Sequence, residues 1–509
     1  MNFEQSPLFE PVLWQGDGFE ILNELLLPGA IEYIHVSDVG QAVDAVREMK
    51  TRAFGQVLTF LYSGALLGRR YQGNEAMPLE AEIERMTQCF SAARPTFDFD
   101  GLRVFFPQWL RNRPTGASPG AWIETRAREM AAAIMSARHA RAKRTAAVLP
   151  ERTRLLTHCN ISGELVAVAH YCKTLGKELS VIATETRPYL QGTRLTAWEL
   201  ARAGVRVSVI PDCAIAQVMA DGKVQAVIVG SDRCARNGDI INKVGTYSLA
   251  HMARQYQVPF YALVQYPGAL ENGAGVEIEE RPAEELLRFQ GQMLLAEGSD
   301  QIHVRYPAFD VTPARLVTSL IDFEGQWSPE SFQAKHQGQG KPAKNGDRRK
   351  RAEGRFLLVY GVPQANYYKE LADALQTESA ESVLVPEMRP ELWGAHCLAG
   401  ELLRRRIPTT LISDNMMGTL FSQGEISRLY LCSRGSPGQA VTGITGSLLA
   451  YQLARAHGVP IELLESKDVD APRDRDVSTF LGQRVLPPGV AIEPLRTEII
   501  PASLVAGCH

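Results

Sequence analysis

The stretch RLLTHCNISGELVAVAHYCKTLGKELSVIAT, residues 154–184, sets the pattern that decides the fold. Its short runs RLLTHC and LSVIAT flank a helix-like segment, and the alternation continues through VRVSVIP (205–211), VQAVIVG (224–230) and FYALV (260–264). Short β-branched runs separated by helical segments are typical of a parallel sheet with crossover helices. The runs show no regular polar–apolar alternation, which predicts strands that are covered on both faces. We therefore expect an α/β protein.

The rest of the chain divides into parts around this pattern. Residues 1–35 hold short apolar stretches between turn signals, which predict a small antiparallel β element, and residues 37–145 have helical spacing. Strand-like runs resume with FLLVYG at 356–361. We predict a mostly helical domain with a short β element over 1–145, a parallel-sheet domain over 146–327, a linker over 328–354 and a second parallel-sheet domain over 355–509.

Composition excludes several classes of function. Residues 335–355 carry eight Lys or Arg and two acidic residues with almost nothing apolar, which favours a flexible linker over a nucleic-acid patch. The net charge of −3 provides no global basic field, and no apolar run approaches the ~20 residues of a membrane span. The amino terminus lacks the order of a secretory signal, and the eight cysteines include no CxxC pair. We expect a cytoplasmic protein without nucleic-acid or membrane partners.

One segment of the chain is repeated. ETRPYLQGTRLTAWEL (185–200) recurs as EMRPELWGAHCLAGEL (387–402), at an offset of 202 residues, with eight of the sixteen positions identical and no gap. The same offset carries Ile210-Pro-Asp212 onto Ile412-Ser-Asp414. We therefore interpret the carboxy-terminal part as a second copy of the α/β unit that lacks the helical domain.

Polar residues gather after the predicted strands of the first copy, where the ligand crevice of a parallel sheet forms. They lie in LLTHCN (155–160), in the repeated segment 185–200 and in VIVGSDRCARNGDIINKVGTY (227–247). A thiol, a carboxylate, amides and cations that meet in one crevice suit a phosphorylated small molecule. The residues concerned are Cys159, Arg187, Gln191, Arg194, Asp232, Arg233, Asn237, Asp239, Asn242 and Lys243.

Residues 10–327 resemble the 5-methylthioribose-1-phosphate isomerase family of methionine salvage, which is related to the alpha, beta and delta subunits of eukaryotic initiation factor 2B. The resemblance implies a small amino-terminal domain followed by a Rossmann-like parallel-sheet domain, to which the repeat adds a second Rossmann-like domain. Its motifs are LPG (27–29), REMKTR (47–52), ARPT (93–96), LTHCN, ETRPYLQGTRLTAWEL, GSDR (230–233), NGD (237–239), NKVGTY (242–247), VPFY (258–261), IEER (278–281) and YPAFDVTP (306–313).

Carried over position by position, the resemblance makes Cys159 and Asp232 the catalytic pair. A ribose 1-phosphate is a locked cyclic acetal, so its ring must open before hydrogen moves from C2 to C1. Asp232 can donate to the ring oxygen if burial keeps it protonated, and Cys159 can then exchange the C2 and C1 protons as a base. A water-poor pocket permits a hydride shift instead, and neither route requires a metal or a cofactor. The resemblance assigns the phosphate and sugar contacts to Arg52, Arg94, Gln191, Asn242 and Lys243.

The implied activity is aldose–ketose isomerisation of 5-methylthioribose 1-phosphate. Two alternatives remain open. The same chemistry can act on 5-deoxyribose 1-phosphate or ribose 1,5-bisphosphate, or the chain can be a non-catalytic regulatory protein like the initiation-factor subunits. The chain has Arg52-Ala53-Phe54-Gly55 where the family has an Arg-Gly-Ala-Pro run, which adds bulk beside the expected phosphate site.

The repeat also predicts that the second copy is catalytically silent. The offset of 202 places Gly361 opposite Cys159, Trp393 opposite Gln191 and Arg434 opposite Asp232. Glycine cannot exchange a proton, and an arginine stays charged and cannot act as the acid. Because family members generally dimerise through their Rossmann-like domains, we expect the copy to take the partner's position as an intrachain pseudo-dimer. A homodimer through these domains is the alternative.

Overall fold

The structure is a computed structural model that describes residues 6–95, 97–295, 300–337, 354–435, 440–467, 476–495 and 497–500. The chain forms two compact units. The first comprises residues 1–147 and 162–175, and the second comprises residues 148–161 and 176–509. Each unit is described by itself below, and we call them the helical unit and the sheet unit.

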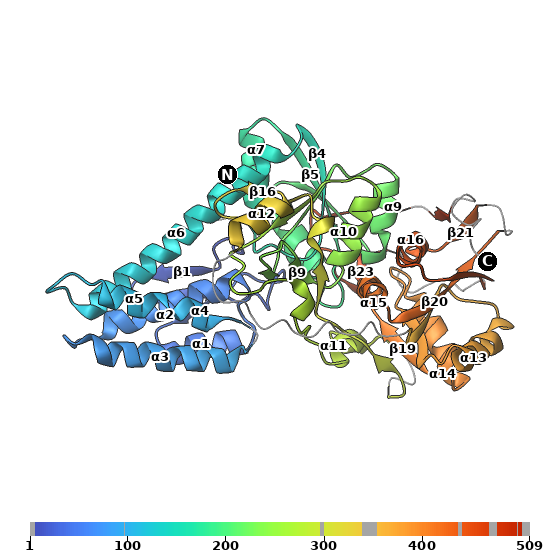
Figure 1. Ribbon diagram of the computed structural model, residues 1–509, viewed down its shortest axis with the longest axis horizontal. Coiled ribbons are helices and arrows are strands. Elements are labelled where there is room, and N and C mark those ends of the chain that lie inside the picture. The colour runs from blue at the N-terminus through green and yellow to red at the C-terminus, as the bar shows by residue number, and fades with distance from the viewer. Residues whose placement is uncertain are drawn as a thin grey trace. The chain divides into compact units, whose positions relative to one another are not determined.

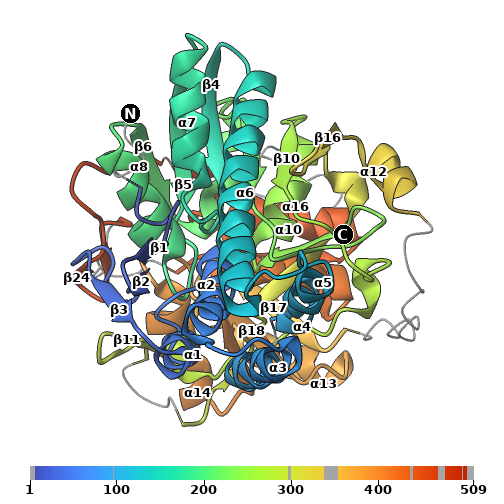
Figure 2. The ribbon, with the colours of Figure 1, turned by 90° about the vertical axis from the view of Figure 1, so that its left-hand side faces the viewer.

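The helical unit combines a small antiparallel sheet with packed helices (Figure 2). Phe60 packs edge-on against Phe90 and Phe106, with ring centroids 5.4 and 5.9 Å apart, so aromatic rings from three helices fill its core. Arg141 on the long helix α6 makes a two-point ion pair with the buried Glu164, at 2.7 and 2.6 Å, which holds α7 against α6. The elements are β1 (Val12–Gln15), β2 (Gly18–Leu22), β3 (Tyr33–Val36), α1 (Val39–Arg47), α2 (Phe54–Arg70), α3 (Ala76–Ala93), α4 (Phe99–Arg103), α5 (Phe105–Arg111), α6 (Pro119–Val148) and α7 (Glu164–Thr174).

The sheet unit contains two large sheets, which confirms the prediction of an α/β protein with Rossmann-like parallel sheets (Figure 1). The first sheet has the order β16-β15-β10-β7-β4-β5-β6-β25, and its five central strands run parallel. Strands β4, β5 and β6 follow one another toward one edge of the sheet. Strand β7 then lies on the other side of β4, so the direction of the strand order reverses between β4 and β7. These strands are β4 (Arg152–Thr157), β5 (Glu178–Thr184), β6 (Arg206–Ile210), β7 (Ala226–Val229), β10 (Phe260–Leu263), β15 (Ser319–Ile321), β16 (Gln326–Trp327) and β25 (Ala491–Ile492).

The second sheet has the order β13-β19-β18-β17-β20-β22. Its strands β17, β18, β19, β20 and β22 follow the same arrangement as β4, β5, β6, β7 and β10, with the reversal between β17 and β20. They are β13 (His303–Val304), β17 (Phe356–Tyr360), β18 (Ser382–Pro386), β19 (Thr409–Ile412), β20 (Ile426–Ser433) and β22 (Ile461–Glu465).

Shorter elements complete the sheet unit. Two π-helices, Gly192–Ala197 and Gly394–Ala399, begin at matching glycines, since a Cβ on either would meet a carbonyl oxygen at 1.7 or 1.8 Å. The helices are α8 (Trp198–Arg202), α9 (Ile215–Ala220), α10 (Thr246–Gln255), α11 (Glu284–Leu287), α12 (Pro329–His336), α13 (Tyr367–Thr377), α14 (Gly400–Arg404), α15 (Met417–Gln423) and α16 (Ser447–His457). The remaining strands are β8 (Arg233–Cys234), β9 (Ile240–Lys243), β11 (Arg288–Phe289), β12 (Gln292–Met293), β14 (Phe309–Thr312), β21 (Val441–Gly443), β23 (Thr479–Phe480), β24 (Gln483–Arg484) and β26 (Glu498–Ile500).

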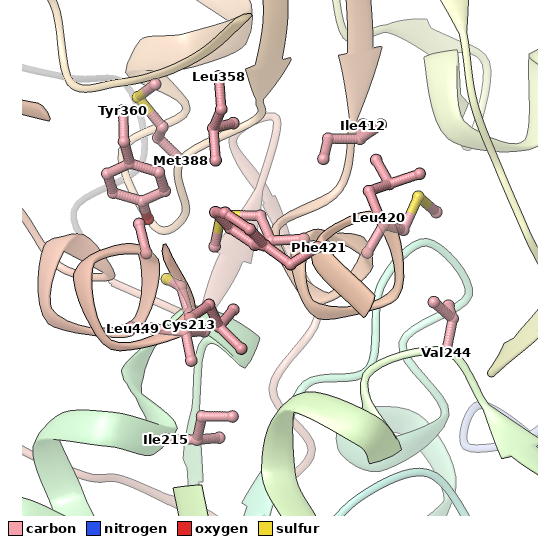
Figure 3. Packing of buried hydrophobic residues seen from close by; sticks show 14 of the residues in the cluster. Cys213, Ile215, Val244, Leu358, Tyr360, Met388, Ile412, Leu420, Phe421 and Leu449 are labelled. Carbon is pink, nitrogen blue, oxygen red and sulfur yellow. The ribbon is translucent and has the colours of Figure 1, made fainter. Parts of the chain in front are cut away.

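The two sheets share one hydrophobic core. The same cluster of buried residues includes Cys213 and Ile215, which follow β6, and Tyr360 and Leu449 from the carboxy-terminal part (Figure 3). Helices of the two halves also pack on each other in this core: α10 contacts α15, and α9 contacts α16. The two sheets are therefore joined by interior packing, and each side supplies part of it.

Each sheet also receives an edge strand from the other half of the unit. In the first sheet, Ala491 and Ile492 of β25 pair in parallel with Ser208 and Val209 of β6. In the second sheet, β13 pairs in parallel with Thr410 and Leu411 of β19. The paired positions on β6 and β19 differ by 202 residues, which is the offset of the repeat.

The predicted linker over 328–354 begins with a helix instead of a coil. Ser328 caps α12 by accepting a hydrogen bond from the amide of Ser331, and Phe332 on this helix is fully buried. The linker was predicted from its many charged residues, and that prediction did not take the apolar Phe332 into account. Residues 338–353, which hold most of the predicted linker, lie outside the described residues.

Candidate active site

Cys159 lies two residues beyond the carboxyl end of β4. Its backbone adopts a left-handed conformation with φ of 65°, and two threonines hold it there. The Cys159 amide donates to Thr186 Oγ1 at 2.9 Å, and the Thr196 hydroxyl donates to the Cys159 carbonyl at 2.7 Å. Asn160 donates to Thr196 Oγ1 at 3.0 Å and closes this small network. The thiol is therefore presented on a turn whose backbone is fixed on both sides.

Asp232 lies three residues beyond the carboxyl end of β7 and is exposed, so the described structure does not supply the burial on which its protonated form was predicted to depend. Its amide donates to the Ile241 carbonyl at 2.9 Å, and its carbonyl accepts from Gln265 Nε2 at 2.6 Å. Strands β4 and β7 are parallel neighbours, and the sheet order reverses between them. In open α/β sheets this switch point is where ligands bind. The structure therefore brings Cys159 and Asp232 to the same end of two adjacent strands, at the switch point of the first sheet.

His158 is a buried positioning residue beside the thiol. Its Nε2 lies 2.8 Å from the Val244 carbonyl, which can only accept, so Nε2 carries the proton and Nδ1 accepts from Thr184 Oγ1 at 2.7 Å. Burial lowers the pKa of His158 to about 4, with the hydrogen bond to Val244 opposing the shift and the charge of Lys243 adding to it. The imidazole is thus neutral near pH 7 and ties β4 to the loop after β9.

The predicted sugar contacts of the sheet unit lie on loops near these strands. Gln191 directly precedes the first π-helix, and its Oε1 is buried without a hydrogen-bond donor among the described residues. Such an acceptor can take a hydroxyl from a bound sugar. Asn242 is buried and donates to Thr246 Oγ1 at 2.9 Å, whereas Lys243 Nζ lies 4.6 Å from the centre of the Phe309 ring.

The other two predicted contacts, Arg52 and Arg94, belong to the helical unit. The Arg52 amide donates to Glu24 Oε1 at 3.0 Å. Burial raises the pKa of Glu24 to about 7, and the opposing charge of Arg52 moderates this shift. Arg94 ends α3, where its amide donates to the Phe90 carbonyl at 2.9 Å. Their part in the site rests on the resemblance alone and stays a prediction.

Three residues of the expected crevice do structural work instead. Arg187 is buried in an ion pair with Glu387, at 2.8 Å through both guanidinium contacts. Asn237 Oδ1 accepts from the amide of Asp239, as in a turn, and Asp239 itself accepts backbone amides at 3.0 and 2.9 Å. The sequence shows that polar residues follow the strands, but it does not show whether their side chains bind other protein groups or a ligand.

Thr186, Thr196 and Tyr306 form part of the site but were absent from the predicted set. The two threonines lie within the repeated segment, where only the charged and amide residues were considered. Tyr306 is buried, and burial raises its pKa, with smaller contributions from neighbouring ionisable groups that include Cys159. It begins the motif YPAFDVTP, so its sequence signal was present but carried no assigned role.

Two further observations concern the described part of the chain. Within it, no three His, Cys, Asp or Glu side chains lie close enough together to hold a metal ion. Nor does any of its helices combine the length and the apolar character needed to cross a bilayer.

Fold and site together define a class of protein. It is an α/β protein with a Rossmann-like sheet that presents a thiol and a carboxyl group at its switch point. The profile of the Initiation factor 2 subunit family matches residues 59–329. The chain belongs to this family.

Individual relatives agree with this assignment. A methylthioribose-1-phosphate isomerase of Albidiferax ferrireducens is 35% identical over 327 residues, which cover 61% of this chain and 91% of the relative. One of Thioalkalivibrio sulfidiphilus is 37% identical over 338 residues, covering 62% and 92%. The crystal structure of 5-methylthioribose 1-phosphate isomerase from Pyrococcus horikoshii matches with a TM-score of 0.57 and 30% identity, over 64% of this chain and 94% of that one. The delta subunit of translation initiation factor eIF-2B from A. fulgidus matches with a TM-score of 0.55 and 30% identity, over 63% and 96%.

Proposed function

We propose that this chain is an aldose–ketose isomerase that converts 5-methylthioribose 1-phosphate into 5-methylthioribulose 1-phosphate. The observation that carries the proposal is the meeting of Cys159 and Asp232 at the switch point of the first sheet. A thiol and an acid at one crevice supply a base and a proton donor, which the reaction needs and a binding module does not. The names of the relatives support the choice of substrate.

The reaction is an internal redox change without an external oxidant. Asp232 donates a proton to the ring oxygen as the bond from C1 to that oxygen breaks. Hydrogen then leaves C2 and arrives at C1, either as a proton carried by Cys159 or as a hydride that shifts directly. The C2 hydroxyl proton returns to Asp232 as the ketone forms, and the phosphate stays on C1. Every atom of the substrate is kept in the product.

Turnover assays test the proposal. The purified chain is incubated with 5-methylthioribose 1-phosphate, 5-deoxyribose 1-phosphate and ribose 1,5-bisphosphate, and ketose formation is followed. We expect the first substrate to react fastest and the variants Cys159→Ser and Asp232→Asn to lose most activity. Cys89→Ser, at an exposed cysteine of the helical unit, is the matched control. No turnover on any substrate would favour a regulatory protein, and full activity in both variants would refute the residue assignment.

Solvent isotope exchange separates the two hydrogen-transfer routes. In deuterated water, transfer through the Cys159 thiol introduces deuterium at C1 of the product, because thiol protons exchange with solvent. A direct hydride shift retains the hydrogen that left C2. The product's C1 signals in a proton spectrum therefore distinguish the routes.

We further propose that residues 355–509 are a second, catalytically silent copy of residues 146–327, joined by the segment 328–354. The equal strand orders support this proposal, as do matching backbone contacts. Asp212 accepts the amides of Thr186 and Arg187, and Asp414 accepts those of Met388 and Arg389 in the same way, 202 residues later.

The copy would occupy the position of a partner subunit within one chain. The exchanged edge strands and the shared core support this proposal, because they are reciprocal in the way that a two-fold interface is. Sedimentation of the full chain tests it. We expect a monomer of 56.1 kDa, and a dimer joined through two first sheets would overturn the pseudo-dimer.

A further inference from the structure

A cavity of about 520 Å³ lies beyond the carboxyl ends of the second sheet. Its lining includes Val362, which follows β17 by two residues, and Arg434, which follows β20 directly. These are the two strands between which the order of the second sheet reverses. The cavity therefore lies at that sheet's own switch point, and its volume falls within the range of small-molecule sites.

Backbone contacts show that this position matches the candidate active site of the first sheet. The Arg434 amide donates to the Thr442 carbonyl at 2.8 Å, as the Asp232 amide donates to the Ile241 carbonyl at 2.9 Å. On the neighbouring strand, the Tyr360 hydroxyl donates to the Thr445 carbonyl at 2.8 Å, where the first sheet has the imidazole of His158 on the Val244 carbonyl. The frame of the site is thus retained although its side chains differ.

The differences change the charge of the site in one direction. Arg434 stands in the position of Asp232, and Lys467 lies two residues beyond the carboxyl end of β22. Both cations line the cavity and both are exposed. An acid has therefore been replaced by an arginine, and a lysine adds a second positive charge to the lining of the same cavity.

Trp393 supplies a hydrogen-bond donor to the same cavity. Its indole lines the cavity, and its Nε1 is buried without an acceptor among the described residues. At the matching position of the first sheet, Gln191 carries a buried acceptor that also lacks a partner there. A buried N–H that forms no hydrogen bond is costly, so an acceptor from a ligand would relieve that cost.

Three acidic residues also line the cavity beside the two cations, and each is engaged or shifted by its own surroundings. Glu493 already accepts from Arg154 and from Ser208, at 3.0 Å for Ser208, and Lys223 lies 3.3 Å away. Burial raises the pKa of Glu391, which favours its neutral form. Asp476 accepts the amide of Ser478 at 2.8 Å.

We propose that this cavity binds a small sugar phosphate without converting it. The phosphate is held by Arg434 and Lys467, which are the cations that recognise phosphate oxygens. A sugar hydroxyl oxygen accepts from Trp393 Nε1. Gly361 provides no thiol at the position of Cys159, and Arg434 provides no acid at the position of Asp232, so the bound ligand is not isomerised. The proposal depends on the cavity and its lining and does not require the activity proposed for Cys159.

Titration calorimetry on the full chain tests this inference, with ribose 5-phosphate as the probe and inorganic phosphate for comparison. We expect the combined variant Arg434→Ala and Lys467→Ala to weaken ribose 5-phosphate binding at least tenfold. Arg428→Ala, on the same strand but outside the cavity lining, is the matched control and should bind as the wild type does. Both cations are exposed, so the variants are expected to fold, and circular dichroism checks this.

Trp393→Phe tests the sugar contact separately. It keeps a ring and removes the N–H donor, so it should weaken ribose 5-phosphate binding several-fold and leave inorganic phosphate binding unchanged. Three outcomes would overturn the proposal: no binding by the wild type, equal binding by the combined Arg434 and Lys467 variant, or inorganic phosphate binding as tightly as the sugar phosphate. Because these are equilibrium measurements, they stand whether or not the chain turns over 5-methylthioribose 1-phosphate.

Discussion

Arg187 and Glu387 form a two-point ion pair that is fully buried between the two sheets, with both N–O distances at 2.8 Å. Arg389 and Glu185 repeat this pair in the opposite direction, at 2.9 Å for the shortest contact. Arg187 also lies over the Phe480 ring, with its guanidinium carbon 4.0 Å from the ring centre. Each half thus supplies one cation and one anion to a closed, reciprocal set.

Breaking one of these pairs is expected to destabilise the sheet unit strongly. Glu387→Gln leaves the Arg187 charge buried without its counter-ion, which should lower the free energy of unfolding by about 3–5 kcal/mol. Urea denaturation measures this. Glu381→Gln is the control, because Glu381 pairs with Arg355 on the exposed surface and should cost less than about 1 kcal/mol. Equal effects of the two variants would contradict a structural role for the buried pair.

Cys159 and Gly361, which occupy equivalent positions in the two sheets, should respond differently to substitution. Cys159 has φ of 65° and Gly361 has φ of 99°, and a Cβ at Gly361 would lie 2.6 Å from the Cβ of Cys432. Cys159→Gly should therefore stay within about 1 kcal/mol of the wild type while losing turnover. Gly361→Cys should lose roughly 1–3 kcal/mol. Urea denaturation of both variants measures these effects, and a fully stable Gly361→Cys would contradict the close contact with Cys432.

Gln191 should illustrate a conflict between stability and binding. Its Oε1 is buried without a donor among the described residues, so Gln191→Met removes an unsatisfied acceptor and should raise the unfolding free energy by about 1 kcal/mol. The same change removes the proposed sugar contact, and KM should rise about tenfold, which corresponds to ~1.4 kcal/mol of lost binding. A loss of kcat with an unchanged KM would contradict a binding role.

His158 should make the chain less stable in acid. Its pKa is lowered in the folded state to about 4 from the ordinary value of 6.5, so below pH 6.5 the unfolded chain binds a proton that the folded chain does not. Its contribution is complete above pH 6.5 and is lost as the pH falls to 4, by about 3 kcal/mol in total.

The measurement compares wild type with His158→Gln. Unfolding free energies are taken at pH 7.5, 5.5 and 4.5, and the difference between the two proteins should shrink as the pH falls. Buried acids such as Asp212, whose pKa is raised to about 6, act in the opposite direction in both proteins, so the comparison largely removes them. A difference that stays constant with pH would rule out a buried neutral imidazole.

The sequence predicted the class of fold and the candidate pair, because both depend on local patterns. Strand-like runs and the polar residues that follow them gave the parallel sheets and placed Cys159 and Asp232 at strand ends. The reversal of order between β4 and β7 is a long-range property, and no local signal determines it. Arg187 was misassigned to the crevice for the same reason, since its partner Glu387 lies 200 residues away.

The repeat contained more information than residue identity revealed. Glu185 and Arg187 recur as Glu387 and Arg389, and the structure shows that the four residues pair crosswise, so their recurrence has a physical cause. The cavity of the second sheet was not predicted, because the sequence shows that the thiol and the acid are absent but does not show how the surrounding loops pack. The alignment placed Arg434 opposite Asp232, but it gave no sign that a cavity lies beside this arginine. Arg52 and Arg94 remain predictions.

The exchanged edge strands bear on how such a chain can change over evolutionary time. Truncation before residue 355 would remove β25 and the whole neighbour of β13, leaving one sheet edge open and a short strand without a partner. Exposed edges favour aggregation, so a deletion of the carboxy-terminal half would be harmful even if that half had no ligand. The duplication is thus hard to reverse, and a half that is retained by necessity is available to acquire a function of its own.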